Sequence, residues 1–312
     1  MTDSAALPVG DLEEFRPALV RHCYRMLGGV ADAEDAAAEA LTRALARADR
    51  FTPGRPLAPW LYRIATNVCL DELRGRHRRL LSTSFGLESE PGAPLGDPLP
   101  DAMFVEPVPD PGDIAVEREG VRLAFVAALQ WLPPRQRAVL ILRDVLAFTA
   151  DETAAILETS TAAVVSLLQR ARTTLVARRG APSDAYAPLD PVQADLLARY
   201  VDAFERHDVE AFAALLQRDA ISDMPPFRWW VRGRFTIARL LALGGCDGAK
   251  LAPAVVSGGP GFGQYRPDQD GVLRPFALVA LEIRGPHVSR MTTFLGTAER
   301  FGEFGLPAVL ER

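Results

Sequence analysis

Apolar residues recur at helical spacing through the first 80 residues. Positions three and four apart share one face of a helix, so each run predicts an amphipathic helix that packs on its neighbours. We therefore predict a small helical domain over residues 1–80. Its core positions are Leu12, Phe15, Leu19, Cys23 and Met26, then Ala33, Ala37, Leu41 and Leu45, then Leu61, Ile64, Val68 and Leu73.

The pattern dissolves over residues 81–115, where Pro, Gly and Ser are frequent. Seven acidic residues lie there without a single Lys or Arg. Such a composition predicts an acidic, flexible and largely disordered linker. An acidic strand can also occupy a basic nucleic-acid channel when no nucleic acid is bound.

A second helical domain is predicted over 116–180, with four short helices. Pro134 suits a first helical turn. Residues 149–157 are predicted as a helix, 158–160 as a turn and 161–179 as a second helix. That order is typical of a helix-turn-helix.

After a Pro-rich connector at 181–190, residues 191–312 show a different pattern. Helices are predicted over 192–206 and 209–216, and strands over 276–283 and 288–295. Helices followed by strands indicate an α+β domain. The predicted fold class is multidomain: two all-α domains, the second with a helix-turn-helix, then an α+β domain.

Composition narrows the function. The formal net charge of −5 argues against a free-standing tight DNA binder. No stretch reaches the roughly 18 apolar residues that a membrane span needs, and the acidic start of the chain is unlike a secretion signal. Cys23, Cys69 and Cys246 are far apart, so we expect neither a disulfide framework nor a metal site. We also expect no cofactor and a cytoplasmic location.

The helix over 161–179 has two distinct faces. Val164, Leu168, Ala171 and Leu175 are expected to face the core, and the opposite stripe can enter a major groove. Alternatively, this stripe is an ordinary solvated helix face. The residues predicted to contact DNA here are Thr161, Val165, Ser166, Gln169, Arg170, Arg172 and Thr173, with Arg178 and Arg179 flanking them.

A basic segment follows the last helix of the first domain. Arg74, Arg76, Arg78 and Arg79 lie just beyond a helix that begins near Trp60. Basic side chains next to aromatic ones suit single-stranded DNA, because bases stack and phosphates need neutralising. Trp60 and Tyr62 are alternatively core anchors.

Two long motifs carry a family resemblance. The run 25–79, with RMLGGVADAEDAAAEALTRALARADRF and PWLYRIATNVCLDELRGRHRR, resembles the second conserved region of extracytoplasmic-function sigma factors, which belong to the sigma-70 family. The run 129–179, with LQWLPPRQRAVLILRDVLAFTADETAAIL and SLLQRARTTL, resembles their fourth region. The resemblance implies a promoter-specificity subunit. Its partners would be core RNA polymerase, through the clamp helices and flap, and the minus-ten and minus-thirty-five elements of promoter DNA.

The resemblance also implies residue roles. Asp32, Glu34, Asp35 and Glu39 would face the polymerase clamp, although they also suit an ordinary solvated helix. The minus-ten strand would be bound by Arg50, Phe51, Trp60, Tyr62, Asn67, Asp71 and Arg74, with Arg76, Arg78 and Arg79 along its backbone.

Some positions depart from the family pattern. Ala38 stands where Gln is usual, and Glu158 where a turn Gly is usual, which is less comfortable if the turn needs positive φ. Val165 and Leu167 replace residues that are often basic, so recognition would depend more on Gln169, Arg170 and Arg172.

From Pro191 onward the chain contains the run LLARYVDAFERHDVEAFAALLQRDAISDMPP and then RWWVRGRFTIARLL. These runs resemble the SnoaL-like branch of the cone-shaped α+β folds related to ketosteroid isomerase. The resemblance implies a small-molecule pocket at Asp223, Met224, Phe227, Trp229, Trp230 and Arg232. Asp223, with His287, would be the candidate base, but the sequence offers no second acid and no oxyanion donor, so we expect no catalytic residues and no enzyme. We predict a modulating domain that folds back on the DNA-binding domains or their linker. The alternative is a ligand-responsive helix-turn-helix regulator that uses this domain as its sensor and does not bind polymerase.

Overall fold

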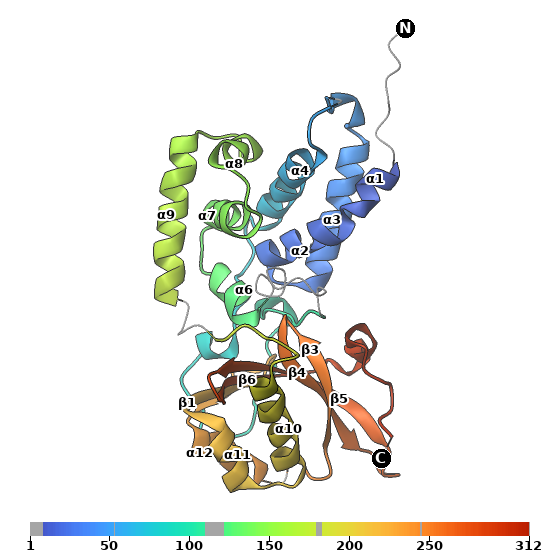
Figure 1. The fold of residues 1–312 in the computed structure, drawn as a ribbon, viewed down its shortest axis with the longest axis vertical. Coiled ribbons are helices and arrows are strands. Elements are labelled where there is room, and N and C mark those ends of the chain that lie inside the picture. Colours follow the sequence, from blue (N-terminus) through green and yellow to red (C-terminus); the bar gives the residue numbers. More distant parts are fainter. Residues whose placement is uncertain (1–8, 53, 110–121, 179–182, 244, 312) are drawn as a thin grey trace. The chain divides into compact units, whose positions relative to one another are not determined.

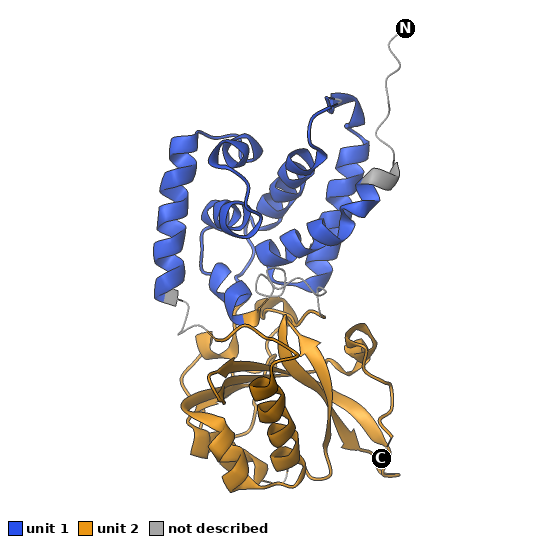
Figure 2. Ribbon diagram, viewed as in Figure 1, with its two compact units in different colours: residues 1–79, 124–180 blue, residues 80–123, 181–312 orange. Residues whose placement is uncertain are grey.

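The chain forms two compact units in a computed structural model that describes residues 9–52, 54–109, 122–178, 183–243 and 245–311. Unit 1 comprises Met1–Arg79 and Ala124–Gly180, and unit 2 comprises Leu80–Leu123 and Ala181–Arg312 (Figure 2). Unit 1 is helical and unit 2 contains a six-stranded sheet. The predicted fold class is confirmed.

Four helices build the first part of unit 1 (Figure 1): α1 (Val9–Glu14), α2 (Arg16–Leu27), α3 (Val30–Leu45) and α4 (Leu57–Glu72). A 3-10 turn covers Ala48–Arg50. The predicted apolar stripes form the core, except that Phe15 and Leu73 are half-buried and Leu45 is 44% exposed. Alanines on the buried face of α3 let the neighbouring helices approach closely, and α2 ends at Gly28, whose φ is +79°.

The second part of unit 1 contains α6 (Leu123–Leu129), α7 (Pro134–Leu140), α8 (Ala150–Ile156) and α9 (Thr161–Arg178). A π-turn at Ile141–Val145 continues α7. Thr149 caps α8: its hydroxyl accepts from the Glu152 N–H at 3.2 Å, while its own N–H donates to the Glu152 carboxylate at 2.7 Å. The predicted helix, turn and helix are therefore present over the described residues 150–178.

The two predicted helical domains pack together within unit 1 around Arg137. Its guanidinium is 2% exposed and donates to the Met26 carbonyl, to Gln130 Oε1 at 2.6 Å and to the Leu132 carbonyl at 3.3 Å. Burial lowers the pKa of Arg137 to about 9, which leaves it charged at neutral pH. Because a buried charge needs hydrogen-bond partners, this arginine ties α7 to the end of α2.

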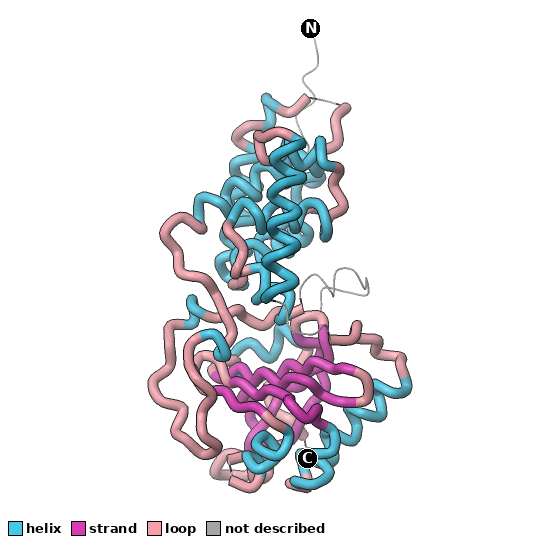
Figure 3. Tube along the Cα trace, turned by 90° about the vertical axis from the view of Figure 1, so that its left-hand side faces the viewer, coloured by secondary structure: helices cyan, strands magenta, loops and turns pink. Residues whose placement is uncertain are grey.

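Unit 2 is a sheet covered on one face by helices (Figures 1 and 3). The strands are β1 (Leu216–Asp223), β2 (Trp230–Arg232), β3 (Lys250–Val256), β4 (Gly259–Pro267), β5 (Leu273–Arg284) and β6 (His287–Leu295), in the order β2-β1-β6-β5-β4-β3. Only the β1–β6 pair is parallel among the pairs described. The helices are α10 (Pro191–Glu205), α11 (Val209–Leu215) and α12 (Arg234–Leu241), and their apolar faces form one core with the sheet.

Residues 80–109 are ordered against the sheet domain, which corrects the disorder predicted there. The Ser89 N–H donates to the Trp230 carbonyl at 2.8 Å, and Trp230 Nε1 donates to the Gly86 carbonyl at 3.2 Å. Further along, the Leu99 N–H donates to the Pro226 carbonyl at 2.8 Å. The segment lacks hydrophobic periodicity because its order comes from backbone groups that pair with unit 2. Residues 110–115 of the predicted linker lie outside the described residues.

Candidate nucleic-acid interface

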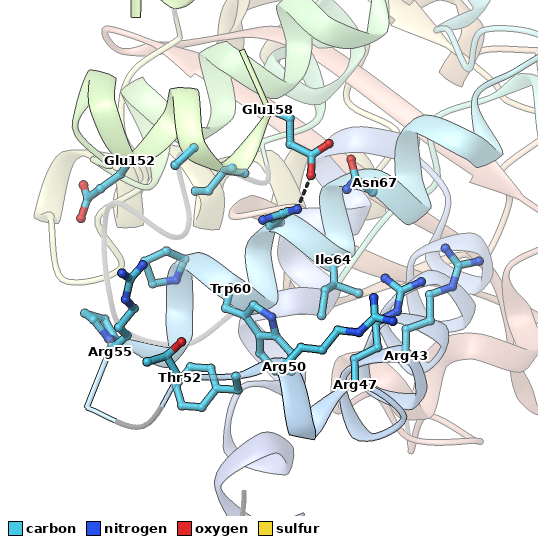
Figure 4. A pocket seen from close by; sticks show the side chains of 16 residues that line it. Arg43, Arg47, Arg50, Thr52, Arg55, Trp60, Ile64, Asn67, Glu152 and Glu158 are labelled. Atoms are coloured by element: carbon cyan, nitrogen blue, oxygen red, sulfur yellow. Dashed lines mark hydrogen bonds and ion pairs between the residues drawn. The ribbon is translucent and has the colours of Figure 1, made fainter. Parts of the chain in front are cut away.

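A cleft of about 570 Å³ in unit 1 is strongly basic (Figure 4). It lies between the end of α3, the start of α4 and helix α8. Four of its arginines come from residues 43–55, which include the end of α3 and the loop after it, and the fifth, Arg63, comes from α4. The charged and polar residues that line it include Arg43, Arg47, Arg50, Arg55, Arg63, Asn67, Glu152 and Glu158. Such a cleft can hold a phosphate backbone.

Two aromatic rings lie in the same cleft. The Phe51 and Trp60 rings have centroids 5.3 Å apart and are tilted by 52°. Both side chains are half-buried, so neither of the predicted extremes, an open ring or a core anchor, describes Trp60. Asn67 is exposed one turn beyond Ile64 on the same helix. Aromatic faces beside cations are suited to unpaired bases, which stack on a ring while their phosphates meet arginine.

Glu158 reaches from the helix-turn-helix into this cleft and forms an ion pair with Arg63 of α4 (Figure 4). Its φ is +50°, so the turn does adopt the left-handed conformation in which glycine is usual. The carboxylate of Glu152, the other acid that lines the cleft, is held by the N-terminal cap of α8. An acid therefore occupies part of an arginine-lined surface where a phosphate could lie.

Tyr62 is buried, in line with the alternative that it is a core anchor, and Arg79 does not lie on an open DNA-facing surface, which corrects the placement predicted for Arg79. Tyr62 is 7% exposed, and its ring meets those of His22 and Phe148 edge-on, with centroids 5.2 and 5.3 Å away. Arg79 is 8% exposed and donates to Asp32 at 2.7 Å. Both side chains make contacts within unit 1 that keep them away from solvent.

The basic residues after α4 are engaged at the opposite end of that helix from Trp60. Arg76 pairs with Asp32 at 3.1 Å and with Glu72 at 2.6 Å. Burial acts to raise the pKa of Asp32, but the hydrogen bonds and charges of Arg79 and Arg76 outweigh it and lower that pKa. The Arg78 guanidinium lies 5.6 Å from the centroid of the Trp131 ring. The predicted minus-ten residues thus form two groups rather than one continuous surface.

Asp71 and Arg74, two further residues predicted to bind the minus-ten strand, form an ion pair with each other. Arg74 lies 3.4 Å from Asp71, which also lies 3.9 Å from Arg43. Both side chains are largely exposed.

The acids predicted to face polymerase lie along α3. Glu34 and Asp35 are exposed, and Glu39 is exposed but paired with Arg43 at 2.7 Å. Asp32 is only 24% exposed because two arginines cover it. Asp32, Asp35 and Glu39 line a groove of about 350 Å³ between α3 and α4.

Helix α9 presents its predicted stripe to solvent. Val164, Leu168 and Ala171 are buried and Leu175 is half-buried, whereas Val165 is 57% exposed. The other predicted contacts, Thr161, Ser166, Gln169, Arg170, Arg172 and Thr173, are exposed as well.

Part of the α9 stripe is already engaged within unit 1. Arg172 is held by Asp144 at 2.6 and 2.9 Å, and the Thr161 hydroxyl donates to Asp151 at 2.8 Å. Arg170 and Gln169 remain the exposed side chains best suited to read base edges. The Arg178 side chain and Arg179 lie outside the described residues.

The predicted pocket of the C-terminal domain is corrected in most of its residues. Asp223 is fully buried and accepts from Thr292 Oγ1 at 2.7 Å and from Arg290 at 3.0 Å. Burial raises the pKa of Asp223, against the lowering effect of Arg290 and Thr292. Its neighbour Ser222 lines the cavity of the domain, and strand alternation places Asp223 on the other face of the sheet.

Of the other predicted pocket residues, Trp229 and Met224 line that cavity, while Phe227 packs against the core around it. Trp230 holds residues 86–89, and exposed Arg232 lies over the Trp230 ring at 5.7 Å. His287 sits at the β5–β6 turn, opposite Arg284, and is not among the residues that hold Asp223.

The sequence prediction missed the arginines of the cleft other than Arg50, and also Glu152. A signal was present, because Arg43, Arg47 and Arg50 recur at steps of four and three near the end of α3. The approach of Glu158 to Arg63 joins residues 95 apart in sequence and had no local signal.

Comparison with known proteins follows the two halves of unit 1. The model of sigma-70 region 2 matches residues 12–79, and that of sigma-70 region 4 matches residues 122–175. The chain is 43% identical over 309 residues to the ECF RNA polymerase sigma factor SigG of Mycobacterium tuberculosis, covering 95% of this chain and 82% of SigG. It is 30% identical over 161 residues to SigW of Bacillus subtilis, covering 52% of this chain and 82% of SigW.

Among solved structures, the ECF sigma factor SigJ of Mycobacterium tuberculosis shares the fold, with a TM-score of 0.63 and 24% identity. That match covers 96% of this chain and all of the SigJ chain. Over the part of the chain that the structure describes, no helix is long and apolar enough to span a membrane, and no cluster of metal-binding side chains is found.

Proposed function

The chain is an RNA polymerase sigma factor of the extracytoplasmic-function type in the sigma-70 family, and from that premise we propose how its parts divide the work. The arginine-lined cleft of unit 1 binds the unpaired minus-ten strand, and the exposed stripe of α9 reads the minus-thirty-five element. The acids of α3 face the polymerase clamp helices, and the second part of unit 1 contacts the flap. The chain acts in the cytoplasm, and the C-terminal domain modulates transcription without catalysing a reaction.

The cleft is the single observation that carries the minus-ten assignment. Five arginines and two aromatic rings surround one space of about 570 Å³. Base stacking on an aromatic side chain stabilises single-strand binding by about 1–3 kcal/mol per base. Helix α3 alone does not offer both cationic and aromatic side chains, because Phe51 comes from the loop after α3 and Trp60 comes from α4.

The packing of unit 1 is incompatible with reading both promoter elements at once. The two elements lie roughly 25 base pairs apart by their names, which is about 85 Å of duplex at 3.4 Å per pair. In unit 1, Glu158 at the helix-turn-helix touches Arg63 beside the minus-ten cleft. We therefore propose that unit 1 is the resting form and that its halves separate when polymerase and promoter are bound.

The docked segment 86–99 supports the modulating role of unit 2. Residues 80–122 connect the two parts of unit 1, and their fully extended reach is about 140–155 Å at 3.3–3.6 Å per residue. Hydrogen bonds of residues 86–108 to the sheet domain keep the docked part of this segment from extending. Docking this segment therefore restrains how far the halves move apart.

Run-off transcription with core polymerase tests these proposals. The chain ending at Gly180 and the full-length variant Trp230→Ala, which loses the anchor of Gly86, should both change promoter output relative to the intact chain. Phe235→Ala is the matched control, because Phe235 is an aromatic residue of the same domain that is 67% exposed. Unchanged output from the truncated chain and from Trp230→Ala would contradict the modulating role. Failure of the intact chain to bind core polymerase would contradict the roles proposed for the cleft, the α9 stripe and the acids of α3.

A further inference from the structure

A cavity of about 320 Å³ lies in unit 2, between the sheet and its covering helices. Its volume falls at the lower end of the range of small-molecule sites. The walls are mostly apolar and aromatic. They include Tyr200, Phe204 and Phe212 from α10 and α11, Ile237 and Leu241 from α12, and Leu251, Phe276, Val279 and Met291 from the strands.

Buried polar groups in the cavity wall lack partners among the described residues. Ser222 is 1% exposed and Trp229 is 5% exposed, and neither Ser222 Oγ nor Trp229 Nε1 has a hydrogen-bond partner in this part of the chain. Gln264, which is 4% exposed, lines the same space. A buried donor without a partner costs about 1–3 kcal/mol, so a ligand that supplies an acceptor would recover that free energy.

The charge of the cavity wall selects the ligand. Among the described lining residues there is no Asp, Glu or His, and Arg266 is the only charged side chain. Its guanidinium carbon lies 3.5 Å from the centroid of the Phe276 ring, and its Nε is buried without a described partner. The indole N–H and the guanidinium can only donate, so the lining is rich in donors and holds one positive charge. It also lacks a carboxylate or imidazole to serve as a proton-transfer base.

We propose that this cavity binds a small apolar monocarboxylate, with its hydrocarbon part among the aromatic residues and its carboxylate on Arg266. The hydroxyl of Ser222, the indole of Trp229 and the amide of Gln264 supply further hydrogen bonds. An amphipathic cation of the same size would place its charge against Arg266 and is disfavoured.

The docked segment forms part of the same wall. Gly92, Ala93 and Leu95 line the cavity. The residues around them are fixed by the hydrogen bond of Ser89 to Trp230 of β2 and that of Leu99 to Pro226, in the loop that supplies Trp229. The cavity exists with this segment in place, so a ligand inside contacts it without displacing it. Ligand and docked segment therefore stabilise each other, and by linkage each raises the affinity of the other. The consequence for transcription rests on the proposed modulating role, whereas binding itself does not.

Calorimetric titration of the full chain with octanoate tests the binding site, with octyltrimethylammonium as the charge-reversed probe. We expect one octanoate per chain and at least tenfold weaker binding of the cation. Arg266→Met should weaken octanoate at least tenfold. Arg274→Met is the matched control, because Arg274 pairs with Arg266 across β4 and β5 but is 58% exposed, bound to Asp268 and outside the cavity. Equal binding of both probes, no binding of octanoate, or equal losses in the two variants would overturn the proposal.

Hydrogen exchange of the wild-type chain provides a second readout that needs no variant. Octanoate should slow amide exchange over residues 86–99, and unchanged exchange there at saturating octanoate would overturn the linkage. Transcription assays separate this inference from the proposed function. If octanoate binds and protects the segment while the chain ending at Gly180 transcribes like the intact chain, the modulating role fails and the binding site stands. If octanoate does not bind while truncation alters transcription, the reverse holds.

Discussion

The ion pair between Glu158 and Arg63 is expected to hold the two parts of unit 1 together. Glu158→Gln removes the negative charge and keeps the size of the side chain and the left-handed turn. Arg63→Gln removes the other partner from α4. Each change should favour separation of the helix-turn-helix from α4, because the pair joins the turn after α8 to α4.

The expected size of this effect follows from exposure. The side chains of Arg63 and Glu158 are 48% and 61% exposed, so solvent screens their attraction. Such pairs contribute about 0–1 kcal/mol, and 1 kcal/mol corresponds to roughly a fivefold change in an opening equilibrium. Glu158→Gly is a less clean change, because glycine also removes the left-handed penalty of about 1 kcal/mol and adds backbone entropy of similar size to the unfolded chain.

Hydrogen exchange in α8 measures this opening directly. Amide hydrogens of α8 should exchange up to about fivefold faster in each single variant than in the wild type. The double variant should show no faster exchange than either single variant, because each single change already breaks the ion pair. High salt should reduce the difference from wild type. Arg55→Gln is the control, because it removes the same charge from the same cleft but not this ion pair. Additive effects of the two single changes would refute the reasoning.

Three further predictions concern buried groups and the recognition helix. Burial lowers the pKa of His22 to about 3 from 6.5, so the unfolded chain binds the proton more readily between these values. Stability should therefore fall as pH drops below 6.5, by up to about 1.4 kcal/mol per pH unit, and His22→Gln should flatten this slope in denaturant titrations whereas exposed His77→Gln should not. Arg137→Met should destabilise the chain by about 2–4 kcal/mol in the same titrations, because it strands buried carbonyls; a loss below 1 kcal/mol would contradict the network. Gln169→Ala should weaken discrimination at the minus-thirty-five element by about 1–3 kcal/mol in competition binding by the holoenzyme, whereas Val176→Ala, on the same helix and 78% exposed, should not.

The sequence predicted the helical parts well because their signals are local. The spacing of Val164, Leu168 and Ala171 identified the buried face of α9, and the order of helix, turn and helix identified the turn at Glu158. Local caps and periods depend on residues within two turns of each other, so one sequence is enough to reveal them.

The parts that were missed depend on distant partners. From the sequence, Tyr62 suits either a DNA-facing aromatic or a core anchor, because Phe148, which packs on it, comes from the other half of unit 1. Asp223 looks like a pocket acid, but β1 was not predicted, and strand alternation decides which face that residue occupies. Order in residues 86–99 likewise comes from backbone pairing with Trp230, which composition does not reveal.

We expect the packed halves of unit 1 to separate on the promoter. Fluorescence energy transfer between dyes on α4 and α8 tests this separation, first in the free chain and then in the complex of the chain with core polymerase and promoter DNA. We predict a short distance in the free chain and one approaching about 85 Å in the complex. A distance that stays short in complexes that initiate transcription, or one that is already long in the free chain, would contradict the account.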